Sequence, residues 1–367
     1  MKILQFAPLW ENVPPKTYGG TELVVHILCE ELQKQGHDVT LIGTKSSETS
    51  VKIEAPVKKP LRELATLIPN YYENLGISKA IELSEEFDIV HNHLGLPVLP
   101  FHDLFRAPMV TTLHGAFTLQ EEINGYKQHK FLPYVSISDS QRVGNPDLNY
   151  IDTVYNGIQV DRYEFQEEPS TNEPYLTFLG RISPEKGTHN AIRLAKETGW
   201  KLIIAAKIDR ADEEYYENEI KHHIDNKQIV FIGEVGHDTK EELLKNSHAV
   251  IHAITWPEPF GLVMAESMAC GTPVLAISKG SVPELIKHGV TGFVENNIED
   301  LIARVKDIDK INRKDCRKHV EENFSEKRMV EGYLKVYRKL ADKPQLLTKP
   351  DLISVNKKFD LDNTAKS

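Results

Sequence analysis

The chain has 367 residues, of which 40% are hydrophobic and 27% are charged, and its formal net charge is −10. Because this length exceeds what a single hydrophobic core usually serves, two domains are expected. The negative charge argues against nonspecific binding of nucleic acid and against strong attraction to an anionic membrane surface.

Signals for targeting, disulfides and metals are sparse. No apolar run reaches the roughly eighteen residues of a membrane span, and the first six residues lead directly into an expected strand, so a cytoplasmic protein without an integral membrane segment is predicted. The cysteines, Cys29, Cys270 and Cys316, are widely spaced and suit a reducing compartment. No H-E-x-x-H pattern occurs, so neither a metal site nor a bound cofactor is predicted.

In the first half of the chain, apolar strands alternate with amphipathic helices, which is typical of a parallel sheet covered on both faces. The loop after the first strand contains neither a G-x-G-x-x-G fingerprint nor a P-loop. Residues 46–78 are polar and poorly periodic, and they are left as variable loops apart from the start of one helix. Strands are expected at 2–8, 39–43, 88–91, 108–114, 134–138 and 153–158, and helices at 21–36 and 70–84.

The polar run Gln166–Pro174 is interpreted as a domain linker, after which the alternation of strands and helices restarts. The predicted organisation is therefore an N-terminal Rossmann-like domain at 1–165 and a second one at 175–324, with a helix at 325–341 and a flexible polar tail at 342–367. Further strands are expected at 177–179, 202–205, 229–232, 249–252 and 274–276, and helices at 188–198, 213–224, 240–246, 260–270 and 298–307.

Several loops of the first domain fall at the carboxyl edge of the predicted sheet, where α/β folds bind ligands. Gly19 and Gly20 let the backbone approach a phosphate closely, and Thr21 is expected to cap the following helix. His114 ends a strand before Gly115, which places its imidazole to hydrogen-bond a sugar hydroxyl or an oxyanion in a cleft. His93 is a weaker candidate for the cleft, since a structural role in the loop suits it as well.

Two cations follow the first strand of the second domain. Arg181 and Lys186 lie in the run Gly180–Gly187 at the carboxyl edge, so both can converge on one anion. A planar guanidinium and a compact ammonium suit the neighbouring phosphates of a diphosphate.

The stretch Thr255–Val274 holds two glutamates eight residues apart, Glu258 and Glu266. With Pro259 in its first turn and Gly271 at its end, a helix from about 260 to 270 is expected. Eight residues span at most about 12 Å, roughly the distance from the hexose to the ribose of a nucleotide-sugar. Between the two carboxylates, the free backbone N–H groups of Gly261, Leu262 and Val263 can receive a diphosphate.

This stretch resembles the retaining glycosyltransferases of family 4, which have the two-domain GT-B fold. Their E-x-F-G-x-x-x-x-E motif is similar to the run from Glu258 to Glu266, which includes Phe260. The resemblance extends to Ala269–Val274, Pro283–Leu285 and Gly289–Phe293 and covers roughly residues 1 to 340. It implies an α/β GT-B fold in which two Rossmann-like domains face a central cleft and the last helix crosses back to the first domain.

The resemblance also implies roles for individual residues. Glu258 would orient the donor hexose and Glu266 the ribose, Arg181 and Lys186 would bind the diphosphate, and His114 would contact the donor sugar near the reacting carbon. Other positions are implied to hold the donor or to line the cleft. Gly19 and Gly20 would approach a phosphate, Phe260 and the backbone of Gly261, Leu262 and Val263 would line the donor site, Gly233 and Val235 would hold the base, and Asn156, in an Asn-Gly turn, would face the cleft.

The function so implied is retaining transfer of a hexose, glucose first, from a UDP-linked donor to a hydroxyl of a saccharide, lipid or small molecule. The nucleotide-sugar is a co-substrate, and no metal or cofactor is implied. The D-x-D matches at 307–309 and 360–362 are interpreted as accidental. A sugar-nucleotide epimerase of the same fold, a phosphorylase and a non-catalytic sugar-nucleotide-binding protein remain alternatives.

Overall fold

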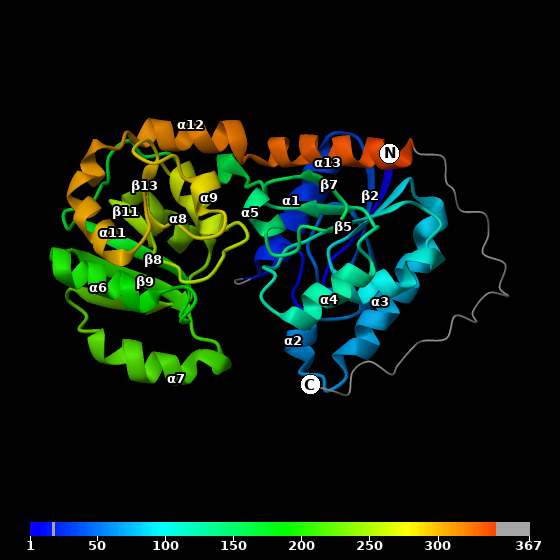
Figure 1. Ribbon diagram of the computed structural model, residues 1–367, viewed down its shortest axis with the longest axis horizontal. Helices are drawn as coiled ribbons and strands as arrows, with labels where there is room; N and C mark the ends of the chain where they lie inside the picture. The colour runs from blue at the N-terminus through cyan, green and yellow to red at the C-terminus, as the bar shows by residue number, and fades with distance from the viewer. Residues whose placement is uncertain (17–18, 343–367) are drawn as a thin grey trace.

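The computed structural model describes residues 1–16 and 19–342, which form two α/β domains side by side (Figure 1). The strand order is β3-β2-β1-β4-β5-β6-β7 in the N-terminal sheet and β10-β9-β8-β11-β12-β13 in the C-terminal sheet. All the pairings within both sheets are parallel, as the alternation of strands and helices predicts.

The N-terminal domain buries both faces of its sheet. On β1, Ile3 packs with helices α1 and α13 on one face, while Leu4 and Phe6 pack with α3 on the other. This alternation follows from the two-residue period of a strand. The strands are β1 (Lys2–Phe6), β2 (Asp38–Thr44), β3 (Lys52–Val57), β4 (Ile89–Asn92), β5 (Met109–Thr112), β6 (Tyr134–Ser136) and β7 (Tyr150–Thr153), and the helices are α1 (Gly20–Lys34), α2 (Leu61–Leu64), α3 (Pro69–Leu83), α4 (Gln120–Gln128) and α5 (Asp139–Arg142).

The C-terminal domain repeats this arrangement. Its strands are β8 (Tyr175–Arg181), β9 (Lys201–Lys207), β10 (Ile229–Gly233), β11 (Ala249–His252), β12 (Val274–Ile277) and β13 (Gly292–Glu295). Its helices are α6 (Thr188–Thr198), α7 (Glu213–Tyr215), α8 (His237–Asn246), α9 (Leu262–Ala269), α10 (Val282–Leu285), α11 (Ile298–Arg304) and α12 (Arg313–Asn323). The segment after α7 continues as a π-helical turn, Tyr216–Ile220, and a 3-10 turn, Lys221–His223.

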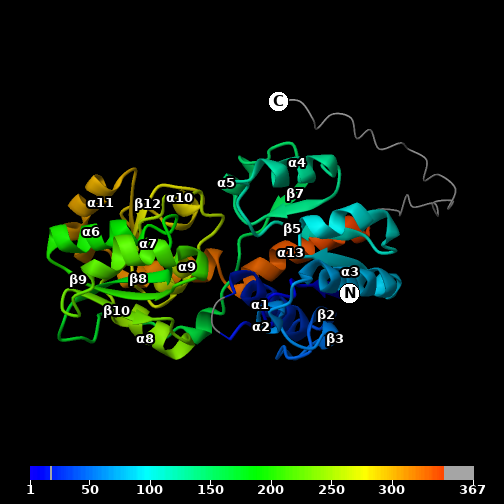
Figure 2. The same ribbon diagram turned by 90° about the horizontal axis from the view of Figure 1, so that it is seen from below.

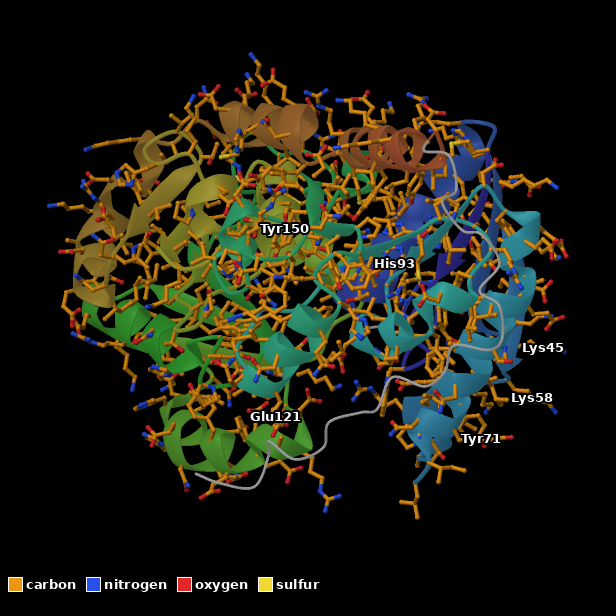
Figure 3. The ribbon with its side chains drawn as sticks, turned by 45° about the vertical axis from the view of Figure 1, so that its right-hand side comes forward. Lys45, Lys58, Tyr71, His93, Glu121 and Tyr150 are labelled. Atoms are coloured by element: carbon orange, nitrogen blue, oxygen red, sulfur yellow. The ribbon has the colours of Figure 1, made fainter. Side chains whose placement is uncertain are left out.

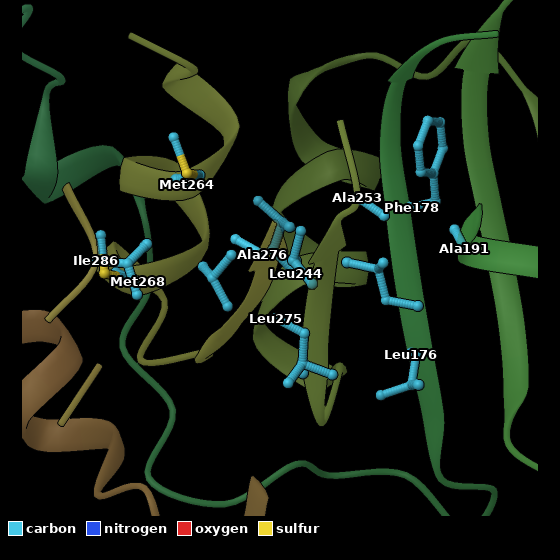
Figure 4. Packing of buried hydrophobic residues seen from close by; sticks show 14 of the residues in the cluster. Leu176, Phe178, Ala191, Leu244, Ala253, Met264, Met268, Leu275, Ala276 and Ile286 are labelled. Carbon is cyan, nitrogen blue, oxygen red and sulfur yellow. The ribbon is translucent and has the colours of Figure 1, made fainter. Parts of the chain in front are cut away.

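Helix α9 is held by an apolar face. Met264 and Met268 are fully buried in the same apolar cluster as Leu275 and Ala276 of β12, and Figure 4 labels these four residues within that cluster. Methionine fills irregular gaps between a helix and a sheet, and each buried side chain contributes about 1.5–3 kcal/mol. The helix that carries Glu266 is thereby fixed against the core.

The last helix, α13 (Glu326–Ala341), returns to the N-terminal domain, as the family resemblance implies. Met329, Tyr333 and Tyr337 are buried in the core that also contains α1. Figure 1 shows α12 on the C-terminal domain followed by α13 along the N-terminal domain, and Figure 2 shows α13 within the N-terminal domain. The predicted tail, 342–367, lies outside the described residues except for Asp342.

The packing changes from one domain to the other earlier than the expected linker at Gln166–Pro174. Val154 belongs to the N-terminal core, whereas Ile158 belongs to the C-terminal core. Ile158 also exchanges backbone hydrogen bonds of 2.9 Å with Phe324 and Glu326, so the two connections between the domains lie side by side. Residues 166–174 instead follow the surface of the C-terminal domain, which explains their polar composition.

Three local expectations in the N-terminal domain are wrong. The strand expected at 153–158 lies earlier in the chain, because β7 spans Tyr150–Thr153. Residues 46–78 contain an edge strand, β3, where variable loops are expected. Its residues are mostly half-exposed, so it lacks an apolar run. Thr21 does not cap α1, because the helix begins at Gly20 and Gly19 occupies the N-cap with a φ of 155°. The hydrogen bond that Thr21 was expected to supply at this end is absent among the described residues.

Candidate active site

A cavity of about 520 Å³ lies between the two domains at the carboxyl ends of their strands. Its C-terminal wall comes from β8, the loop before α6, and the segment from β11 to α9, and its N-terminal wall comes from the loop after β1 and the start of α1. The residues predicted for the site that line the cavity are Gly19, Gly20, His114, Asn156, Arg181, Lys186, Val235, Glu258, Phe260, Gly261, Leu262, Val263 and Glu266.

Two predicted residues do not line this cavity. Gly233 ends β10 with a φ of 77°, at an irregularity in the pairing with β9. Its neighbour Glu234 lines the cavity in its place, next to Val235. His93 is also absent from the wall, since it lies behind His114 in the N-terminal domain.

His93 positions His114. Its side chain is buried, with an exposed fraction of 4%, and its Nδ1 lies 2.9 Å from His114 Nε2. Its Nε2 lies 2.7 Å from Gln5 Oε1, and the Gln5 amide donates to Tyr337 Oη of α13 at 3.0 Å. Figure 3 shows His93 inside the N-terminal domain, whereas Tyr71 lies at its outer edge. A chain of hydrogen bonds through Gln5 and His93 therefore links helix α13 to His114 at the cavity wall.

Burial keeps His114 neutral. It lowers the pKa of the imidazole to about 4, because the charged form would lose its hydration. A neutral imidazole can still donate or accept one hydrogen bond at the cavity wall, as a contact to a sugar hydroxyl requires.

The turn before α9 departs from the expected helix. The helix begins at Leu262 instead of Phe260, and Gly261 forms its N-cap with a left-handed φ of 81°. Pro259 consequently precedes the helix by three residues. Because a side chain is strained at this φ, glycine suits the position, and the start of the helix turns its free N–H groups toward the cavity.

Glu258 is held by two donors. Its Oε2 accepts a hydrogen bond from Trp256 Nε1 at 3.1 Å and forms a short ion pair with Lys186. The Lys186 ammonium also lies 5.2 Å from the centre of the Trp256 ring. Glu258 has an exposed fraction of only 8%. Without these partners, burial of its negative charge would cost free energy of folding.

Glu266 lies one to two turns into α9 and is 3% exposed. Its Oε1 accepts hydrogen bonds from Lys240 Nζ at 2.6 Å and from Tyr163 Oη at 2.8 Å. The pKa of Tyr163 is held well above its usual value, mainly because the phenol is buried and also because the negative charge of Glu266 lies nearby. The phenol therefore remains a hydrogen-bond donor. The carboxylate is fixed in one orientation at the cavity wall.

Arg181 is surrounded by carboxylates. It pairs with Glu185, and its guanidinium nitrogens lie 3.4 Å from Asp212 and 3.7 Å from Asp209. Lys207 Nζ lies 2.9 Å from Asp209 and also lines the cavity. Both predicted cations, Arg181 and Lys186, thus reach the same cavity, where each is paired with acids.

Sequence reasoning missed several residues of the cavity wall. His252 ends β11, and no hydrogen-bond partner of its buried Nε2 lies among the described residues. Burial lowers its pKa to about 4, so it offers a neutral nitrogen beside Glu258. Its place at a strand's carboxyl end was the signal that could have found it. The other missed residues include Trp10, Glu11, Glu22, Arg62, Lys207, Lys240 and Trp256.

Glu22 is the carboxyl of the cavity with the most altered proton affinity. Burial, with a smaller contribution from Glu11, raises its pKa to about 7 despite the opposing effects of a backbone hydrogen bond and Arg62. Between pH 4.5 and 7 the folded protein therefore keeps a proton that the unfolded chain has lost. Stability attributable to this group falls as the pH rises through that window.

We expect Glu22→Gln to remove this pH dependence. Between pH 4.5 and 7.5 the wild-type protein should lose about 2 to 3 kcal/mol of unfolding free energy relative to the variant, since a shift of one pKa unit corresponds to about 1.4 kcal/mol. Urea unfolding of both proteins at several pH values measures the difference. Parallel stability curves for the two proteins would show that folding does not raise the pKa of Glu22.

No group of three or more His, Cys, Asp or Glu side chains in residues 1–16 and 19–342 is arranged to hold a metal ion. In the same part of the chain, no helix is long and apolar enough to cross a membrane.

Two family models match consecutive parts of the chain. The model of Glycosyltransferase Family 4 matches residues 18–162, and that of Glycosyl transferases group 1 matches residues 159–327. The chain belongs to the group 1 glycosyltransferases. The two matches meet where the packing passes from one domain to the other.

This glycosyltransferase is 26% identical over 361 residues to the glycogen synthase of Mycobacterium tuberculosis, a match that covers 84% of this chain and 86% of the relative. Solved structures that share its fold include the following two. The sucrose-phosphate synthase of Thermosynechococcus elongatus superposes with a TM-score of 0.77 at 16% identity, over 93% of this chain and 99% of the other. Anabaena HepE in complex with UDP and glucose superposes with a TM-score of 0.73 at 19% identity, over 93% and 100%. The fold is the predicted GT-B fold.

Proposed function

We propose that this glycosyltransferase transfers glucose from UDP-glucose to an acceptor hydroxyl with retention of the anomeric configuration. The observation that carries the proposal is the convergence of two buried, oriented glutamates and two cations on one interdomain cavity. The complex of the structural neighbour HepE with UDP and glucose supports the choice of nucleotide and sugar. The glycogen synthase relative is consistent with glucose.

In the proposed reaction, the acceptor oxygen bonds to the anomeric carbon on the face from which the diphosphate departs. The bond between that carbon and the phosphate oxygen breaks, and the departing phosphate oxygen takes the proton of the acceptor hydroxyl. Lys186 and Arg181, with the backbone N–H groups at the start of α9, stabilise the negative charge that develops on the leaving group. No metal ion or bound cofactor takes part in this scheme.

Donor binding requires the paired cations to exchange partners. Lys186 now binds Glu258, and Arg181 binds three acids. A diphosphate that enters between them replaces part of these contacts, which frees Glu258 to accept hydrogen bonds from hexose hydroxyls. Glu266, held by Lys240 and Tyr163, is placed to accept from the ribose hydroxyls.

Thermal stability tests the donor assignment. The protein is melted with UDP-, GDP- and ADP-glucose, each beside its free diphosphate and without added metal. A ligand at a hundred times its dissociation constant stabilises by about 2.7 kcal/mol, which is a visible rise in Tm. We expect the largest rise with UDP-glucose, and we expect Glu266→Ala to abolish it. Glu63→Ala, which removes a carboxylate outside the cavity wall, serves as the control.

Three results would contradict the proposal. If only GDP-glucose or only ADP-glucose raises the Tm, that nucleotide-sugar is the donor instead of UDP-glucose. Retention is tested by NMR of the product at early times, because an inverted anomer would exclude the same-face scheme. Conversion of the donor to an isomer in the absence of acceptor would instead identify an epimerase.

A further inference from the structure

The N-terminal wall of the cavity contains polar and aromatic side chains that the donor scheme does not use. Trp10 and Glu11 come from the loop after β1, Glu22 comes from the first turn of α1, and Arg62 comes from α2. These segments lie opposite the wall that carries Lys186, Glu258 and Glu266. The fold therefore brings an indole, two carboxyls and a guanidinium to one side of the cleft.

Contacts within this wall hold the side chains in place. The Trp10 Nε1 donates a hydrogen bond of 2.9 Å to Glu73 of α3, which fixes the indole by its polar edge while 39% of the residue remains exposed. The Arg62 guanidinium pairs with the Glu11 carboxylate, so each is oriented by the other. An exposed indole fixed in this way presents a rigid apolar surface at the cavity.

Glu22 adds a buried carboxyl to the same wall. Its exposed fraction is 6%, and its Oε2 lies 3.2 Å from the point where a side chain on Gly19 would begin. The charges that act on it come from Glu11 and Arg62. Two acids and one cation give this wall no excess of positive charge. An acceptor that carries a phosphate or a carboxylate would be repelled by these acids. The one cation among these side chains, the Arg62 guanidinium, is already paired with Glu11.

We propose that Trp10, Glu11 and Glu22 form a subsite for the ring of a neutral saccharide acceptor. A sugar ring has an apolar face of C–H groups that packs on an indole, and its hydroxyls donate hydrogen bonds to carboxyl oxygens. Arg62 is a positioning residue that orients Glu11. The inference rests on the proposed transferase function and narrows its acceptor to an uncharged, polyhydroxylated molecule.

Direct binding tests the subsite. Tryptophan fluorescence of the full-length protein is titrated with glucose, maltose and sucrose, and separately with glucose 6-phosphate and glucuronate, in the presence and absence of UDP. We expect at least one neutral sugar to bind and to change the emission of Trp10, which the Trp10→Phe protein identifies by difference. The anionic sugars should bind at least tenfold more weakly.

Variants separate recognition from folding. Trp10→Ala should raise the Kd of the neutral sugar at least tenfold, and Trp10→Phe should restore most of the affinity because it keeps an aromatic surface. Glu22→Gln should raise the Kd at pH 8, where the wild-type carboxyl accepts hydrogen bonds at both oxygens. Glu63→Gln, on the same short helix as Arg62 but outside the cavity, should bind as the wild type does.

Failure of this inference differs from failure of the donor assignment. If UDP-glucose raises the Tm but no neutral sugar binds, or if an anionic sugar binds more tightly, the subsite is overturned and the transferase remains. If a neutral sugar binds at Trp10 but no nucleotide-sugar stabilises the protein, a sugar-binding site at Trp10 is shown, but the transferase proposal falls and with it the role of this site as an acceptor subsite. Unchanged affinity in Trp10→Ala also overturns the subsite.

Discussion

Replacing Lys186 with alanine is expected to lower kcat by about a hundredfold to a thousandfold. Loss of one group that stabilises developing charge on a leaving group typically costs about 3 to 4 kcal/mol of activation free energy. Lys186 is the cation closest to the predicted hexose ligand Glu258, with which it pairs directly. The effect should appear mainly in kcat, because the charge on the diphosphate grows as the bond breaks. Initial rates of UDP release from UDP-glucose measure it.

A matched control comes from the same domain. Lys201 begins β9, outside the cavity wall, and pairs with Glu173 at 2.6 Å. Lys201→Ala should leave kcat within about twofold of the wild type, since a surface ion pair contributes little. The Tm of unliganded Lys186→Ala is measured as well, because Glu258 then keeps only Trp256 as a partner. A normal kcat with a raised KM would assign Lys186 to donor binding alone.

The arrangement of strands and helices could be predicted because it depends on local periodicity. The apolar positions of α1 recur at three- and four-residue spacing, and the structure buries Val24, Ile27, Leu28 and Leu32. The motif from Glu258 to Glu266 also lies within one continuous segment, so its resemblance to the family motif could be recognised in the sequence, and both glutamates line the cavity.

The N-terminal wall of the site could not be predicted in this way. Trp10, Glu22 and Arg62 come from three segments, and neither periodicity nor spacing indicates that they meet. The same holds for His93, whose neighbour Gln5 bonds to Tyr337 across 332 positions of sequence. The carboxylates around Arg181 were missed for a related reason, since Asp209 and Asp212 follow a different strand, β9.

Substituting Gly187 with alanine is expected to destabilise the C-terminal domain by about 2–5 kcal/mol. Gly187 is the N-cap of α6 with a left-handed φ of 71°, where a side chain costs about 1–2 kcal/mol. A Cβ here would also lie 1.9 Å from the carbonyl oxygen of Ala253, a clash that only movement of the backbone can relieve. Overpacking of this kind adds about 1–3 kcal/mol or more. Urea unfolding of the variant and wild type measures the loss.

The other end of the same helix provides the control that separates the two causes. Gly199 is the C-cap of α6 with a φ of 76°, almost the same as that of Gly187, yet no atom lies within 4 Å of the position of its added Cβ. Gly199→Ala should therefore cost only the strain, about 1–2 kcal/mol, and should keep full activity. Gly187→Ala should also lose activity, because Gly187 follows Lys186 and Ala253 follows His252, so the clash pushes apart two segments of the cavity wall. Equal destabilisation by both substitutions would mean that backbone strain alone decides the outcome and that the segments after β8 and β11 can separate freely.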